Sequence, residues 1–96
     1  MIVVTGSVMA REDSLDEVRR LSLQHVHRAW MYLPPAVHAD CENPLRLVFI
    51  EQWTDHAALL AHFAMPASRD FVRALQSLAA AATTIEIYDA ARLEKL

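Results

Sequence analysis

In the stretch 45-LRLVFIEQWTDHAALLAHF-63, a predicted strand runs directly into a predicted helix, and this junction is the clearest indication of the fold. Its first part alternates between two faces: Leu47, Phe49, Glu51 and Trp53 point one way, and Val48, Ile50 and Gln52 point the other. Alternation with a period of two is typical of a strand with one buried face. Thr54 or Asp55 can then cap a helix that continues to about Phe63. The stretch therefore predicts a strand, a tight turn and a short helix in immediate succession.

The segment before this junction supplies two strands and a helix. β-Branched residues predict a strand over Ile2–Ala10, and a short strand is expected over Ala36–Asp40. Between them, Ser14 and Glu17 match the capping-box pattern that begins many helices. Small and apolar residues then recur at helical spacing and predict a buried stripe, made of Leu15, Val18, Ser22, Val26 and Ala29.

The segment after the junction supplies a second helix and the last strand. Pro66 ends the short helix and begins another, because proline fits the first turn of a helix but not its interior. Its expected buried stripe is Phe71, Leu75, Leu78 and Ala82. A final strand is predicted over Thr83–Ala90. The order of elements predicts an α+β, ferredoxin-like β-α-β-β-α-α-β fold with a four-stranded antiparallel sheet, and residues 1–96 form a single domain.

The sheet of such a fold has one face that its own helices do not cover. Apolar residues are nevertheless predicted on both faces of the first, third and last strands, and 54% of the chain is hydrophobic. A half-covered antiparallel sheet normally has one polar face. We therefore expect a homodimer in which two copies pack their open sheet faces together.

Composition argues against several functional classes. The net charge is −3 without a basic run, so we expect no nucleic-acid partner. No apolar segment approaches the ~20 residues of a membrane span, so no membrane association is expected. The start lacks the features of a signal peptide, and the single Cys41 suits a reducing compartment, which together predict a cytoplasmic protein.

A longer stretch, 47-LVFIEQWTDHAALLAHFAMPASRDF-71, resembles the antibiotic-biosynthesis monooxygenase family. The resemblance lies in the Glu-x-Trp that ends a strand, the capping Asp, the Ala-Leu pair, the helical His and the helix led by Pro. It implies a dimeric α+β barrel with a ferredoxin-like protomer. Members of that family typically oxidise quinols or polycyclic phenols with O₂, without metal or flavin. The resemblance thus implies no cofactor.

The same resemblance indicates where a substrate cavity would lie, between the sheet and the helices. It implies that Trp53 and His62 are catalytic residues there, with Phe49 and Glu51 in the cavity wall. A purely structural role is the alternative for three of these residues. Trp53 would pack in the core, His62 would be a hydrogen-bonded helix residue, and Glu51 would pair with Arg46 or Arg73. Haem degradation is disfavoured, because that branch uses a histidine on its last helix, and residues 67–80 contain none.

The other histidines do not predict a metal site. His25 and His27 are two residues apart on a helix and so diverge. His38 lies close to Cys41, but no second pair completes a four-ligand zinc site. We expect His25, His27, His38 and His56 to be surface residues and predict no metal.

The segment 28-RAWMYLPPA-36 departs from the family's pattern, in which a Glu-Pro-Gly-Cys type of turn is common. Four large apolar residues in succession cannot all face inward, and the two prolines after them stiffen the segment. An exposed apolar patch marks an interaction site. The patch would consist of Trp30, Met31, Tyr32, Leu33, Pro34 and Pro35.

Two functions are consistent with these features. The first prediction is a protein-binding module on a monooxygenase-like scaffold, which engages a partner protein through Trp30–Pro35. Such a confined departure also suits an engineered binding loop. The alternative is a cofactor-independent monooxygenase that oxidises a quinol-like or polyphenol-like aromatic with O₂, with the segment as a hydrophobic lip of the cavity. A third possibility is a dimeric domain in which the segment lies at the dimer interface.

Overall fold

The computed structural model describes residues 1–28 and 36–96, and its elements follow the predicted order. The bounds are β1 (Ile2–Met9), α1 (Leu15–Arg28), β2 (Ala36–Ala39), β3 (Arg46–Trp53), α2 (His56–Ala64), α3 (Pro66–Leu78) and β4 (Thr84–Asp89). The α+β ferredoxin-like arrangement is therefore confirmed.

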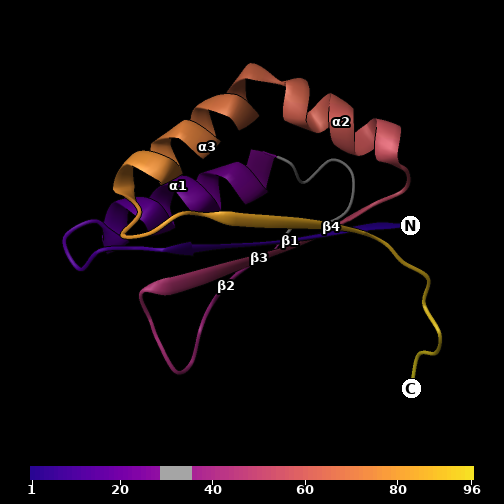
Figure 1. Cartoon of the computed structure of the whole chain (residues 1–96), viewed down its shortest axis with the longest axis horizontal. Helices are drawn as coiled ribbons and strands as arrows, with labels where there is room; N and C mark the ends of the chain where they lie inside the picture. The colour runs from indigo at the N-terminus through magenta and orange to yellow at the C-terminus, as the bar shows by residue number, and fades with distance from the viewer. Residues whose placement is uncertain (29–35) are drawn as a thin grey trace.

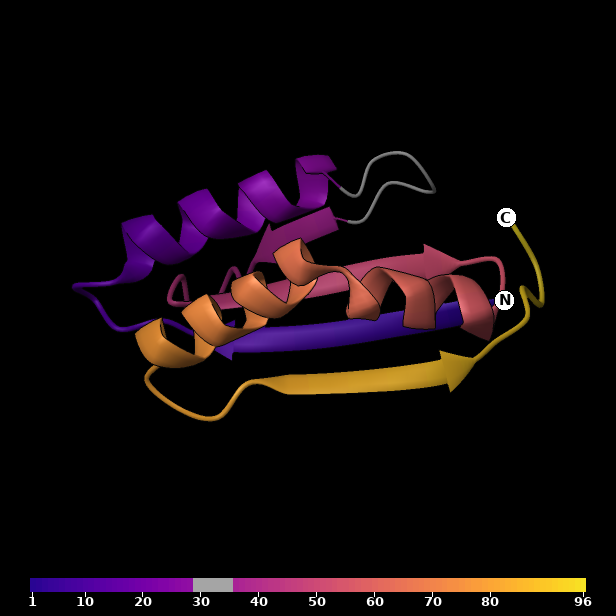
Figure 2. The same ribbon diagram turned by 90° about the horizontal axis from the view of Figure 1, so that it is seen from above.

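The strands form one antiparallel sheet in the order β2-β3-β1-β4. The helices lie together on one face of it (Figure 1). Seen through the helix layer, α1 lies along the β2 side, α2 and α3 lie over the middle of the sheet, and β4 lies beyond them at the far edge (Figure 2). The helix layer thus covers the central strands and leaves β4 uncovered.

The core confirms the alternation predicted for β3. Leu47, Phe49, Glu51 and Trp53 are all buried, whereas Ile50 and Gln52 are exposed. From α1, the predicted stripe packs against this face through Val18, Ser22 and Val26, and its last member, Ala29, lies outside the described residues. Helix α3 contributes Phe71, Leu75 and Leu78 to the same hydrophobic core. The expected extension to Ala82 is wrong, because α3 ends at Leu78 and Ala82 is exposed.

The two helix caps predicted from sequence have different outcomes. The Asp55 cap is confirmed, since its carboxylate accepts a hydrogen bond from the backbone N–H of Ala58 at 2.8 Å. The capping box of Ser14 and Glu17 is wrong. The Ser14 hydroxyl instead donates to the Leu78 carbonyl at 2.7 Å, and Glu17 pairs with Arg20 on the same helix.

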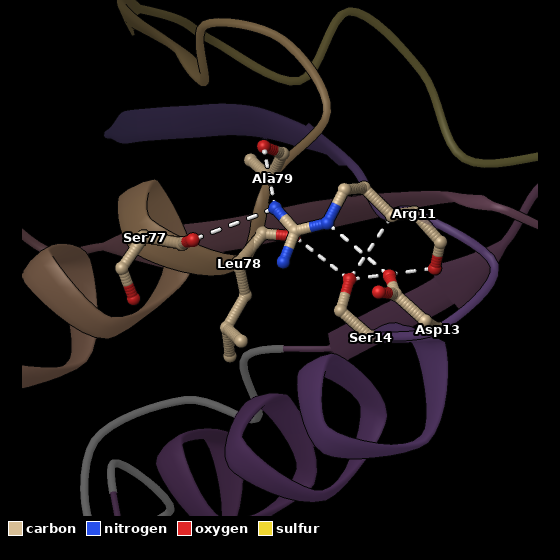
Figure 3. A network of polar contacts seen from close by, with 6 residues as sticks. All are labelled: Arg11, Asp13, Ser14, Ser77, Leu78 and Ala79. Carbon is tan, nitrogen blue, oxygen red and sulfur yellow. Dashed lines mark hydrogen bonds and ion pairs between the residues drawn. The ribbon is translucent and has the colours of Figure 1, made fainter.

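Ser14 belongs to a polar network that joins the start of α1 to the end of α3 (Figure 3). Within it, Arg11 donates to the carbonyls of Ser77 and Ala79, at 3.5 and 3.3 Å. The last carbonyls of a helix lack partners inside the helix, and a nearby cation stabilises them. Ser14 Oγ also accepts a hydrogen bond from the Arg11 backbone N–H, at 3.0 Å, in place of the Glu17 backbone N–H that a capping box requires.

The face opposite the helices carries both apolar and polar side chains. Strand register places Val3 beside Tyr88, and Thr5 between Ile50 and Glu86, on this face. Ile50 and Tyr88 are 43% and 47% exposed. The apolar residues predicted there are thus present, interspersed with hydroxyl and carboxylate groups. Among the described helices, none combines the length and apolar character needed to cross a membrane.

Candidate functional site

Strand β3 brings two of the expected site residues into direct contact. Trp53 and Glu51 lie opposite Ile2 and Val4 of β1, and both point toward the helices. The Trp53 indole N–H donates to Glu51 Oε2 at 3.0 Å, and both residues are buried. The alternative pairing of Glu51 with Arg46 is wrong, because Arg46 is on the opposite strand face and pairs with Asp40. Glu51 is thus a cavity residue held by an indole.

Helix α2 brings His62 against this pair. The His62 ring lies 4.7 Å from the Trp53 ring, between centroids, at a tilt of 37°. Its Nε2 is 3.5 Å from the hydroxyl of the buried Ser68 on α3. The Asp55 cap fixes the start of α2 and therefore the helical position from which His62 projects. His62 is half-buried and lies at the cavity, as the resemblance implied.

His25 is the site residue that sequence reasoning missed. The expectation of a surface histidine is wrong, because its ring stacks on Phe71 at 4.0 Å with planes 7° apart. It also lies 5.4 Å from the His62 ring. The sequence feature that could have predicted its partial burial is its position on α1. His25 is adjacent to Val26 and three residues after Ser22, so it lies on the edge of the buried stripe. By contrast His27, His38 and His56 are exposed, as expected.

These side chains surround a small cavity between the sheet and the helices. Its volume is about 70 Å³, and Phe49, Glu51, His25 and His62 are among its lining residues. Gly6 forms part of the sheet wall. A methyl group at Gly6 would lie 3.2 Å from the Thr84 carbonyl oxygen, so glycine allows β4 to approach closely here.

The cavity continues into a larger outer groove between α3 and β4. This groove has a volume of about 320 Å³. It shares four lining residues with the cavity: Phe63, Ser68, Val72 and Ile85. Arg69 and Arg73, both exposed and one helical turn apart on α3, also line it. The arrangement is a narrow inner chamber with an outer vestibule that carries positive charge.

Among the surface groups with shifted pKa values, two lie on the sheet or beside it. The backbone N–H of Glu42 donates to Asp40 and, with Arg46, holds the pKa of that carboxyl below its usual range. On β4, the hydrogen bond and the negative charge of Glu86 raise the pKa of Tyr88. The Asp40 turn fixes the connection into β3, and Tyr88 lies on the open sheet face. Both effects therefore concern the scaffold rather than the cavity.

The segment Trp30, Met31, Tyr32, Leu33, Pro34 and Pro35 lies outside the described residues. Its assignment as a protein-binding loop therefore stays a prediction from sequence, as does the idea that it was engineered. Within residues 1–28 and 36–96, the geometry converges on the cavity and does not support a protein-binding role.

The walls of the cavity determine its possible chemistry. Phe49, Phe63 and Phe71 offer aromatic surfaces for a flat apolar molecule. Trp53, which the resemblance placed in the lining, instead packs in the core with Val4 and Leu59 and reaches the cavity through its contacts with Glu51 and His62. His62 can accept or return a proton, and Glu51 can orient a polar group. Such a mixture of apolar walls and a few polar groups is typical of a small-molecule site.

Comparison with known proteins agrees with this fold. The antibiotic biosynthesis monooxygenase family model matches residues 1–74. A crystal structure of an antibiotic biosynthesis monooxygenase has 25% sequence identity and a TM-score of 0.87, covering 96% of this chain and 100% of that chain. No match was found among curated protein sequences.

Two more distant structures show the fold alone. A Deinococcus radiodurans protein described within the same family has 21% identity and a TM-score of 0.93, covering 100% of this chain and 98% of its own. Rv0793 from Mycobacterium tuberculosis has 16% identity and a TM-score of 0.85, covering 98% of this chain and 96% of its own. Because the family model spans most of the chain and the element order agrees with it, the chain belongs to the antibiotic biosynthesis monooxygenase family.

Proposed function

We propose that this chain is a monooxygenase that oxidises a quinol-like aromatic with O₂ in the cavity between the sheet and the helices. The observation that carries the proposal is the His62 ring, held 4.7 Å from Trp53 at a cavity with aromatic walls. Family membership supports the reaction class. As the resemblance implies, the reaction proceeds without metal or flavin.

In this reaction His62 acts as the base. It takes the proton of a phenolic hydroxyl, and the resulting phenolate pushes electron density onto a ring carbon that bonds to O₂. The O–O bond then breaks, one oxygen stays on carbon as the new carbonyl, and the other leaves as water with the hydrogen of that carbon and the proton from His62. The net change is phenol plus O₂ to quinone plus water, which balances without a further reductant. Positioned proton transfer of this kind contributes ~10²–10⁴-fold.

The sizes of the inner chamber and the outer groove suggest that the two spaces hold different reactants. The inner chamber, at about 70 Å³, is much smaller than the outer groove, at about 320 Å³. The aromatic substrate therefore occupies the outer groove, with its reacting edge at the shared residues Phe63 and Ser68. His62 then faces the edge of the ring that carries the hydroxyl.

Charge in the outer groove favours an acidic substrate. Arg69 and Arg73 line the groove, and the ion pairs found among the described residues involve neither of them. Arginine binds carboxylates in a bidentate manner. We therefore propose an aromatic substrate that carries a carboxylate at the end away from the reacting hydroxyl.

The open sheet face supports a homodimer. Ile50 is the exposed apolar residue on the central strand β3 at this face, and Tyr88 adds an aromatic side chain on β4. Replacing Ile50 with Arg is expected to shift the protein from dimer to monomer in analytical ultracentrifugation. Leu60→Arg, at an exposed position on α2, is the matched control and should leave the dimer intact. A wild-type chain that sediments as a monomer would refute this pairing.

The enzymatic proposal is tested by incubating the protein with mono-, bi- and tricyclic quinols under isotopically labelled O₂. We expect one labelled oxygen in each quinone product, because uncatalysed autoxidation forms peroxide and leaves the product unlabelled. His62→Ala should lower kcat by about 100-fold, whereas His56→Ala on the same helix should have no effect. Unlabelled products, or equal rates for wild type and His62→Ala, would rule the mechanism out.

A further inference from the structure

Two histidines and one carboxylate converge on the cavity from three separate elements. His25 comes from α1, Glu51 from β3 and His62 from α2. One potential ligand atom of each residue lies within 4.8 Å of those of the other two. From this geometry we infer that the cavity is also a binding site for a divalent transition-metal ion.

The donor set suits such an ion. Imidazole nitrogens suit zinc, cobalt, nickel and iron, and two histidines with one carboxylate form a recurrent three-ligand set that leaves positions open. Ligand atoms about 2.1 Å from a tetrahedral ion lie roughly 3.4 Å from each other, so side-chain shifts of about 1 Å close this cluster. The remaining coordination positions would face the cavity, where water or a small ligand can enter.

The surroundings hold the three side chains in place. Trp53 donates to Glu51 at 3.0 Å, in the way that groups around a metal site orient its carboxylate. His25 is stacked on Phe71, and His62 contacts both Trp53 and Ser68. Ligands fixed by packing and hydrogen bonds lose little freedom when they bind an ion.

Burial of Glu51 adds an independent argument. This side chain is 7% exposed, and the hydrogen bond that it accepts within the described residues comes from a neutral indole. A buried carboxylate charge is unfavourable unless it is paired or coordinates a metal. A bound divalent cation would supply a positive charge beside it.

Metal binding would act against the proposed oxygenation. His62 would share its ring nitrogen with the metal ion, and a nitrogen that coordinates a metal does not accept a proton from a phenol. Zinc is therefore expected to inhibit quinol oxidation, and a chelator to restore it. This inhibition rests on the proposed function, whereas metal binding itself does not.

The test begins with protein treated with a chelator and dialysed, then titrated with Zn²⁺ by calorimetry and with Co²⁺ by visible absorption. We expect one ion per chain. His25→Ala, Glu51→Gln and His62→Ala should each weaken binding by more than about 100-fold, since even residues that only support ligands change affinity 10–100-fold. Glu51→Gln keeps an oxygen that can accept the Trp53 hydrogen bond, so it removes the charge with little disturbance. The control is His27→Ala, which removes an exposed histidine from α1, the helix that carries His25. This variant should bind the metal ion with the affinity of the wild type.

The outcomes separate the two proposals. Absence of binding up to millimolar metal, or equal affinity in wild type and the three variants, overturns the metal site whatever the enzymatic activity. Tight binding that depends on all three residues supports it, even if no quinol is oxidised. Circular dichroism of each variant confirms that a loss of binding is not a loss of fold.

Discussion

The indole nitrogen of Trp53 and the carboxylate of Glu51 form a buried hydrogen bond, 3.0 Å long, between residues two apart on one strand face. Because side chains alternate along a strand, residues two apart point the same way, and both residues of this pair face the helices. The hydrogen bond fixes the Glu51 carboxylate relative to the Trp53 ring. It links the core beneath α2, where Trp53 contacts Leu59, to the cavity that Glu51 lines.

Removing the donor of this bond should destabilise the protein. Trp53→Phe keeps an aromatic ring but leaves Glu51 without its indole partner, so we expect a loss of about 1–3 kcal/mol in the free energy of unfolding. Urea titration followed by far-UV circular dichroism measures it without relying on tryptophan emission. In a Glu51→Ala background the same change should have a smaller effect, because the interaction is already absent. Equal losses in both backgrounds would mean that the hydrogen bond contributes nothing.

The network at the end of α3 should contribute to stability through Ser14. This residue is 4% exposed, and its hydroxyl donates to the Leu78 carbonyl. Ser14→Ala should reduce the free energy of unfolding by about 1–2 kcal/mol and lower Tm by roughly 4–8 °C or more. Ser77→Ala is the control, because the exposed Ser77 hydroxyl bonds only within its own helix, to Ala74, among the described residues. If both variants melt together, the link between α1 and α3 is not stabilising.

Asp40 should make stability depend on acid pH. The Glu42 backbone N–H and the Arg46 guanidinium lower its pKa in the folded state. A lowered folded pKa contributes stability above the unfolded pKa, near 3.9, and that stability is lost as pH falls through the folded value. Wild type should therefore be more resistant to urea than Asp40→Asn at pH 7, and the difference should vanish toward pH 2.

The salt dependence of the Asp40 effect provides its control. Asp40 lies at the surface, so about 1 M salt should shrink the difference between wild type and Asp40→Asn at neutral pH. The amide of the Asp40→Asn variant retains an oxygen that can accept the Glu42 hydrogen bond, so the comparison isolates the charge. A difference that persists unchanged at low pH would contradict the assignment.

The two arginines of the outer groove should determine the preference for acidic substrates. Replacing Arg69 and Arg73 together with Gln is expected to raise KM for a carboxylated quinol about 5–10-fold, because each exposed charge contact contributes up to about 1 kcal/mol. The kcat value and the KM for the neutral analogue should not change. Arg19→Gln on α1, outside the groove, is the control for net charge. An equal rise in KM for the carboxylated and the neutral quinol would show that the arginines do not discriminate between substrates by charge.

Much of the scaffold could be predicted from local pattern. The alternation of Leu47, Phe49, Glu51 and Trp53 specifies a strand face, because burial on one side requires a period of two. Asp55 and Pro66 specify where helices begin, because a cap and a ring-locked φ act within a few residues. These features act locally and are visible in the sequence.

The capping prediction at Ser14 shows where local pattern fails. The sequence contains Ser14 and Glu17 at capping-box spacing. The Ser14 hydroxyl nevertheless donates its hydrogen bond to the Leu78 carbonyl, 64 residues away in the chain. Only packing of α1 beside α3 brings this acceptor close. Ala82 shows the same limit, since α3 ends at Leu78, before the predicted stripe does.

The candidate site divides in the same way. The strand, turn and helix that present Phe49, Glu51, Trp53 and His62 follow from local pattern, because these residues lie in one continuous stretch with a clear period. The position of His25 beside them depends on the packing of α1, which is distant in the chain, because that packing brings the His25 ring against Phe71 and near His62. The physical reason is range: hydrogen-bonded periodicity acts between neighbours in the chain, whereas a cavity is made by side chains that only packing brings together.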